Sequence, residues 1–131
     1  MAKRESIHVR SQRTENRMAR YLFGPEAIRE WKEEHDIRGD DAFGEVWIGE
    51  VKSTAWPSAP GAMWTHLHKA FAQACRYGSE RVFAAWLPKG CEVRNAAVMY
   101  RERGLAVAVS AQAFRADVLG WWDDDEEDDE D

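Results

Sequence analysis

The chain of 131 residues has only two cysteines, four histidines and no long hydrophobic run. Cys75 and Cys91 stand alone without a Cys-x-x-Cys spacing, so the sequence indicates neither a disulfide framework nor a zinc ribbon. No stretch approaches the roughly 18 continuous apolar residues of a membrane span, and no leading apolar segment resembles a signal peptide. We therefore expect a cytoplasmic protein that does not associate with a membrane.

The histidines are too scattered to form a metal site. His66 and His68 fall two residues apart on an expected helix, which directs them to different faces, and His8 and His35 lie far from both in the sequence. A metal bound by this chain would therefore need other ligands.

Acidic residues outnumber basic ones, but they gather at one end. The net charge is -6, yet residues 123–131 contribute nine acids and no base, and residues 1–122 carry a balance of +3. We expect a flexible basic arm at 1–10, one folded domain at 11–120 and a disordered acidic tail at 121–131. The arm either contacts phosphates or solubilises the chain. The tail either contacts the protein's own basic surface, recruits a basic partner, or solubilises.

Hydrophobic periodicity predicts an α/β fold with a central mixed sheet flanked by helices on both faces. The residues from Asp41 to Lys52 read as a strand or tight hairpin with Gly44 at the bend. Further expected strands are 82–87 and 105–109. Expected helices are 11–22, a second one from Pro25 that ends where Asp36-Ile37-Arg38-Gly39 breaks the pattern, and then 62–77, 93–102 and 111–119.

Asp40 precedes a Glu50-Val51-Lys52 triplet that ends the apolar strand. Strand residues alternate between faces, so Glu50 and Lys52 should point the same way. Two carboxylates and an ammonium meeting at one sheet edge suit Mg²⁺ chemistry, because oxygen ligands hold the ion and a lysine orients the attacking water. The alternative is that Glu50 and Lys52 form a solvated strand face.

The ordered set of motifs resembles the PD-(D/E)XK nuclease superfamily. In that family a helix with a glutamate comes first, then an aspartate near a strand, then Glu-x-Lys on the next strand, then a helix. Glu15 lies in the expected first helix, and Gln73 and Tyr77 have the Gln-x-x-x-Tyr spacing of the RecB-like branch. The resemblance covers roughly residues 11–109. Glycine, not proline, precedes Asp40, and the adjacent Asp41 leaves the ligand ambiguous by one position.

The resemblance implies a restriction-endonuclease-like core that binds Mg²⁺, with Mn²⁺ as a substitute. It implies that Lys52 holds the nucleophilic water and that Glu15 reaches a second ion. The implied metal ligands are Asp40 or Asp41, Glu50 and the backbone carbonyl of Val51. The resemblance also implies DNA contacts for Gln73 and Tyr77. Positive charge and position add Lys69, Arg13, Arg17 and Trp56 as expected DNA-binding residues. For Trp56 the alternative is that it packs its loop onto the following helix.

These features together lead us to expect a Mg²⁺-dependent DNA endonuclease similar to a Holliday-junction resolvase, acting on DNA that can be branched and working as a homodimer. Two alternatives stay open. One is a RecB-like or lambda-type exonuclease, which Gln73 and Tyr77 favour. The other is a non-catalytic DNA-binding module that keeps the nuclease fold.

Overall fold

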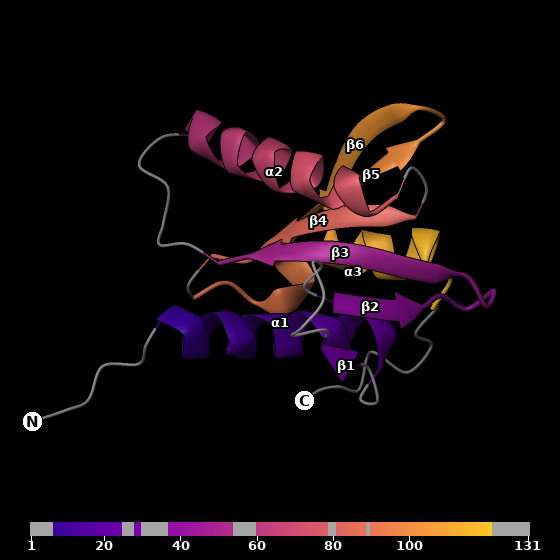
Figure 1. Cartoon of the computed structure of the whole chain (residues 1–131), viewed down its shortest axis with the longest axis horizontal. Coiled ribbons are helices and arrows are strands. Elements are labelled where there is room, and N and C mark those ends of the chain that lie inside the picture. The colour runs from indigo at the N-terminus through magenta and orange to yellow at the C-terminus, as the bar shows by residue number, and fades with distance from the viewer. Residues whose placement is uncertain are drawn as a thin grey trace, which may run out of the picture.

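The computed structural model describes residues 7–24, 28–29, 37–53, 60–78, 81–88 and 90–121. Within them, six strands form one mixed sheet whose spatial order follows the chain (Figure 1). The strands are β1 (Ile28–Arg29), β2 (Ile37–Asp40), β3 (Val46–Lys52), β4 (Val82–Trp86), β5 (Ala97–Glu102) and β6 (Leu105–Ser110). Neighbouring strands pair antiparallel except β3 and β4, which run parallel.

Helices cover both faces of this sheet, so the expected α/β architecture is confirmed. α1 (Ile7–Phe23) lies on one face, and α2 (Pro60–Ala74) with its last 3₁₀ turn (Cys75–Tyr77) lies on the other (Figure 1). The short α3 (Ala111–Ala113) and the π-helical turn after it (Phe114–Val118) pack on the α1 side. A β3–α2–β4 crossover is what a parallel pair requires, because the chain must return to the starting end of the sheet.

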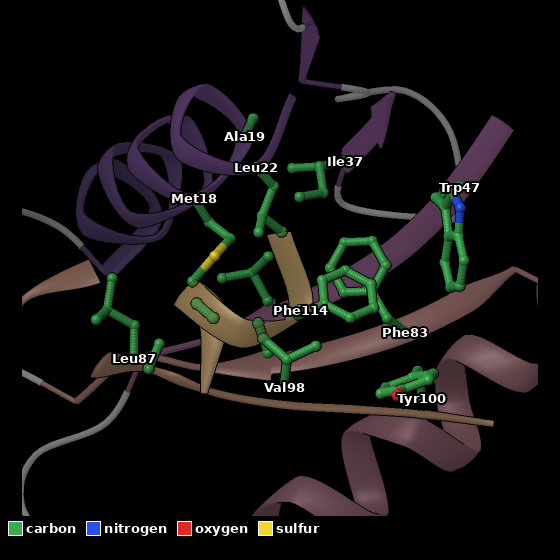
Figure 2. Close-up of a cluster of buried hydrophobic side chains, with 14 of the residues drawn as sticks. Met18, Ala19, Leu22, Ile37, Trp47, Phe83, Leu87, Val98, Tyr100 and Phe114 are labelled. Carbon is green, nitrogen blue, oxygen red and sulfur yellow. The ribbon is translucent and has the colours of Figure 1, made fainter. Parts of the chain in front are cut away.

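The alternation of β4 divides the interior into two cores. Phe83 and Ala85 pack in the core under α1, whereas Ala84 and Trp86 pack in the core under α2. Phe83 is fully buried, and its ring lies 5.3 Å from that of Phe114 (Figure 2). A Cβ at Gly49 would lie 2.2 Å from the Phe83 ring, so β3 needs a glycine where that ring crosses it.

The prediction of a helix at 93–102 is wrong. The structure has a 3₁₀ turn at Val93–Asn95 and then strand β5, which forms a hairpin with β6 through Arg103 and Gly104. Both turn residues have positive φ, 54° and 83°, as a type I′ hairpin turn requires. Ala97 and Val98 to Tyr100 are buried or half-buried, so β5 shows no alternation that would separate it from a helix.

Three boundaries also differ from expectation. Ile28–Arg29 is a short strand where a second helix was expected, and β2 begins at Ile37 in a segment expected to break the pattern. α1 begins at Ile7, so 7–10 are helical and not part of a flexible arm. Residues 1–6 and 122–131, where the arm and the acidic tail were expected, lie outside the described residues. Among the described helices, none is long and apolar enough to cross a membrane.

Candidate active site at the carboxyl end of strand β3

Glu50 and Lys52 share the face of β3 that α2 covers. In the parallel ladder Glu50 pairs with Ala84 and Lys52 with Trp86, and both partners belong to the core under α2. Lys52 Nζ lies 3.8 Å from Glu50 Oε1, and only 6% of the Glu50 side chain is exposed against 42% for Lys52. A buried carboxylate is thus joined to a half-exposed ammonium, which gives the pair access to solvent on the lysine side.

This pair lies near the carboxyl ends of the two parallel strands. The chain leaves β3 at Lys52 and enters α2 from that end of the sheet, as the arrow of β3 and the start of α2 show (Figure 1). Leu87 N donates to Lys52 O at 2.9 Å, which extends the β3–β4 pairing past the end of β4. In α/β sheets, ligands bind outside the carboxyl ends of parallel strands, so the position favours a site.

Asp40 does not meet Glu50, which corrects the expected convergence of the two carboxylates. Asp40 pairs with Val46, at the turn end of the β2–β3 hairpin, and its side chain is exposed. Val46 and Glu50 are four residues apart, about 13 Å at 3.3 Å per residue. Asp40 and Glu50 do lie on the same face of the sheet, because Asp40 pairs with Val46, which has the same parity as Glu50 along β3. The short hairpin turn is what separates them.

Asp41 is committed to the hairpin, so its expected role as an alternative metal ligand is not supported by the geometry. Its Oδ1 accepts hydrogen bonds from the Phe43 N–H at 2.8 Å and the Glu45 N–H at 2.9 Å. Its Oδ2 accepts from the indole N–H of Trp47 at 3.0 Å, and only 7% of Asp41 is exposed. Both carboxylate oxygens therefore hold the turn and the first residues of β3 together.

The pKa of Asp41 reflects these contacts. Burial raises the pKa and is the largest single influence. The hydrogen bonds from Glu45, Trp47 and Phe43, together with the positive charge of Arg81, outweigh it and lower the net pKa below its ordinary value of 3.8. The carboxylate therefore stays ionised in the folded protein. The spacing Asp41-Ala42-Phe43-Gly44, an aspartate before a glycine bend, is the turn signal that could have identified this role in the sequence.

The side chains of Glu15 and Val51 belong to the opposite side of the sheet, whereas the expected metal ligand at Val51 is its backbone carbonyl. Val51 is buried in the core under α1, and Glu15 is half-buried on α1 itself. Because Glu50 points to the α2 face, Glu15 comes from a helix on the other face. Arg13 and Arg17 are exposed on α1 as well, and Arg17 Nη2 donates to Cys91 O at 3.5 Å.

On α2, Lys69 is exposed and Gln73 is half-buried. Arg101 of β5 donates to Cys75 Sγ at 3.3 Å, so the Cys75 flank of α2 faces β5. Two residues turn a helix through about 200°, which puts Gln73 on the opposite flank, on the β3 side of α2. The side chain of Tyr77 and all of Trp56 lie outside what the structure describes.

Within the described residues, no three His, Cys, Asp or Glu side chains gather closely enough to hold a metal ion. Comparisons with family models, with curated proteins and with solved structures gave no match. The Glu50–Lys52 pair and its position in the fold are therefore the features of this chain that point to a function.

Proposed function

We propose that the chain is a metal-dependent DNA nuclease of PD-(D/E)XK type with Glu50 and Lys52 at its centre. The observation that carries the proposal is the 3.8 Å pair of a buried carboxylate and a half-exposed ammonium near the carboxyl end of a parallel strand. A buried charge is costly unless it is paired or binds a metal, and such groups concentrate at functional sites.

The order of elements supports the same reading. A helix, an antiparallel strand pair that carries Glu-x-Lys on its second strand and a crossover helix occur in the order α1, β2–β3 and α2, with the two-residue β1 between α1 and β2. This is the order of the nuclease family that the sequence resembles. In the register of β3 against β4, Glu50 and Lys52 lie on the face of the sheet that α2 covers, and α2 is the helix that carries Gln73.

The residues present fit a Mg²⁺ ion in part. Glu50 supplies one carboxylate oxygen donor, and Mg²⁺ is commonly held by one or two carboxylates plus waters and substrate phosphates. When bound, the ion would polarise the scissile phosphate and lower the pKa of a water. Lys52 would orient that water or offset charge that develops on the phosphate.

A second carboxylate ligand, in addition to Glu50, would complete the proposed metal site. Ile37 pairs with Gly49, and Glu50 is the next residue along β3. In the sequence the acidic residue directly before Ile37 is Asp36, which lies outside the described residues. Substitution of Asp36 and of Asp40 in parallel is therefore the direct way to ask which aspartate cleavage requires.

A DNA-binding module without cleavage is the second candidate. It is favoured by the separation of Asp40 from Glu50 by four residue steps of β3. In that case Glu50 and Lys52 would be a structural ion pair, and DNA affinity would not depend on a divalent ion.

The test is incubation of the chain with a four-way junction, a linear duplex and a single strand, each with and without Mg²⁺. We expect Mg²⁺-dependent cleavage of the junction, and preference for linear ends would instead indicate an exonuclease. Glu50→Gln should abolish cleavage, and Lys52→Ala should reduce it on the order of 10²- to 10⁴-fold, the usual range for a residue that manages a proton or water.

The matched control is Glu45→Gln, because Glu45 is an exposed glutamate of the same hairpin that pairs with Arg81 at 3.6 Å. This variant should cleave like the parent chain. Asp36→Asn and Asp40→Asn complete the series, and loss of cleavage in only one of them identifies the second carboxylate. DNA binding without cleavage under any metal condition would sink the nuclease proposal and support the binding module.

A further inference from the structure

Among the described residues, no strand pairs with the outer edge of β6. This strand ends the strand order, runs for six residues and carries the sequence Leu-Ala-Val-Ala-Val-Ser without a charge. The other edge is β1, which is only two residues long. Long uncharged edge strands recruit further strands, and proteins normally blunt them with charges, proline or short length. In the part of the sheet that the structure describes, only β6 lacks these protections.

Both faces of β6 are also apolar and incompletely covered. Leu105 is 68% exposed, and Val107 and Val109 are only half-buried on the α1 side. On the α2 side stand Ala106, which is exposed, and Ala108, which is half-buried.

The flank of α2 that faces this region carries an exposed aromatic pair. Trp64 is 47% exposed, and its ring lies 5.5 Å from that of His68, one turn further along. Phe71 lies on the same flank, and Arg101 of β5 sits 5.6 Å above its ring. The Trp64–His68 pair is therefore directed to the β5–β6 side of the molecule.

We propose that the β6 edge, together with the Trp64–His68 flank of α2, is the interface with a second copy of this chain. The two β6 strands pair antiparallel about a twofold axis and join the two sheets into one. A backbone edge offers alternating N–H and C=O groups, which match another strand edge. Because residues 105–110 carry no charge, two copies meet there without repulsion.

Side-chain parity restricts the register of this pairing. A twofold axis perpendicular to the sheet keeps each α2 on the same face, so residues of like parity must pair. With Val107 opposite Val107 of the second copy, Leu105 lies opposite Val109 of the second copy. Leucine–valine and valine–valine pairs are favourable across strands, and this register would cover the most exposed apolar side chain of β6.

The pairing would fix the relation between the two Glu50–Lys52 pairs. β3 is the fourth strand inwards from the interface, counting β6 as the first. The two β3 strands would therefore stand seven strand spacings apart, roughly 34 Å at about 4.8 Å each. Both pairs would lie on the same face of the joined sheet and be related by the twofold axis.

The first test is the mass of the chain in solution without DNA or metal, which keeps it independent of nuclease activity. Sedimentation equilibrium should give twice the chain mass of 15.1 kDa. Leu105→Glu and Ala106→Lys should each shift the mass to that of one chain, because charges would then face apolar side chains of the second copy. Both residues are exposed in one chain, so the fold should survive.

Val46→Lys is the matched control, since Val46 is an exposed strand residue (39%) remote from β6, and it should stay dimeric. Val107→Cys, with Cys75 and Cys91 replaced by alanine, should form an interchain disulfide on mild oxidation. A mass of 15.1 kDa at every soluble concentration, or a dimer that Leu105→Glu and Ala106→Lys leave intact, would overturn the proposal. So would a monomer in which only DNA changes the environment of Trp64, because that surface would then bind nucleic acid.

Discussion

The two ends of β3 each hold a buried carboxylate, but the partners of these carboxylates differ. At the turn end, Asp41 receives hydrogen bonds from two backbone N–H groups and the Trp47 indole, all between 2.8 and 3.0 Å. At the carboxyl end, Glu50 has an ammonium on a flexible stem at 3.8 Å, and that lysine is half-exposed. Fixed backbone donors define a structural role, whereas a mobile charged partner at a strand end suits a reacting site.

Burial of a carboxylate does not by itself indicate a catalytic role. Asp41 is 7% exposed and Glu50 is 4% exposed, so exposure fails to separate them. The position of each residue separates them, because Asp41 lies in the turn before β3 and Glu50 lies near the carboxyl ends of the parallel strands.

The largest effect on stability should come from the turn end. Asp41→Ala leaves the Trp47 indole and two backbone N–H groups without their acceptor, which we expect to lower the free energy of unfolding by roughly 2 to 4 kcal/mol. Glu50→Gln should change it by less than about 1 kcal/mol, because its partner Lys52 can turn to water. Urea unfolding followed by circular dichroism measures both.

Equal losses in the two variants would contradict the division of roles. Asp40→Ala is the matched control, since Asp40 is the exposed neighbour of Asp41 and its loss should leave the unfolding midpoint nearly unchanged.

A smaller loss should follow when only the indole donor is removed. Trp47→Phe keeps an aromatic ring near Phe114, whose ring lies edge-on at 5.3 Å, but leaves Asp41 Oδ2 without its indole partner. We expect a cost of about 1 to 2 kcal/mol in the free energy of unfolding. In an Asp41→Ala background the same substitution should cost less, and a double-mutant cycle measures the difference. Strict additivity would mean that the hydrogen bond contributes nothing.

The sequence was sufficient for the sheet with helices on both faces, for the bend at Gly44 and for the shared face of Glu50 and Lys52, but not for strand β2. These features follow from periodicity and turn residues that act over a few positions. β5 could not be recognised as a strand, because burial on both faces removes the alternation, although Arg103-Gly104 in a tight hairpin turn marked its end.

The distance between Asp40 and Glu50 could not be predicted, because it depends on the length of β2 and on which residues form the turn. A sequence spacing of ten residues is compatible with either convergence or separation in a hairpin. The hydrogen bonds from the Phe43 and Glu45 N–H groups to Asp41 fix the bend between Asp40 and Val46. This bend keeps Asp40 at the turn end of the hairpin, away from Glu50. The turn-forming role of an aspartate before a glycine was the signal that competed with its role as a metal ligand.

The smallest predicted effect is an acid dependence of stability that belongs to the turn end. The pKa of Asp41 is lowered in the folded chain from its ordinary value of 3.8. A carboxylate with a depressed folded pKa stabilises the protein above the unfolded value, and this contribution is lost as the pH falls through the folded value. The free energy of unfolding should therefore decline below about pH 3.8 more steeply in the parent chain than in Asp41→Asn, which cannot titrate there. Unfolding in urea at a series of pH values from neutral downwards measures the difference, and parallel curves for the parent and Asp41→Asn would show that Asp41 does not link protonation to folding.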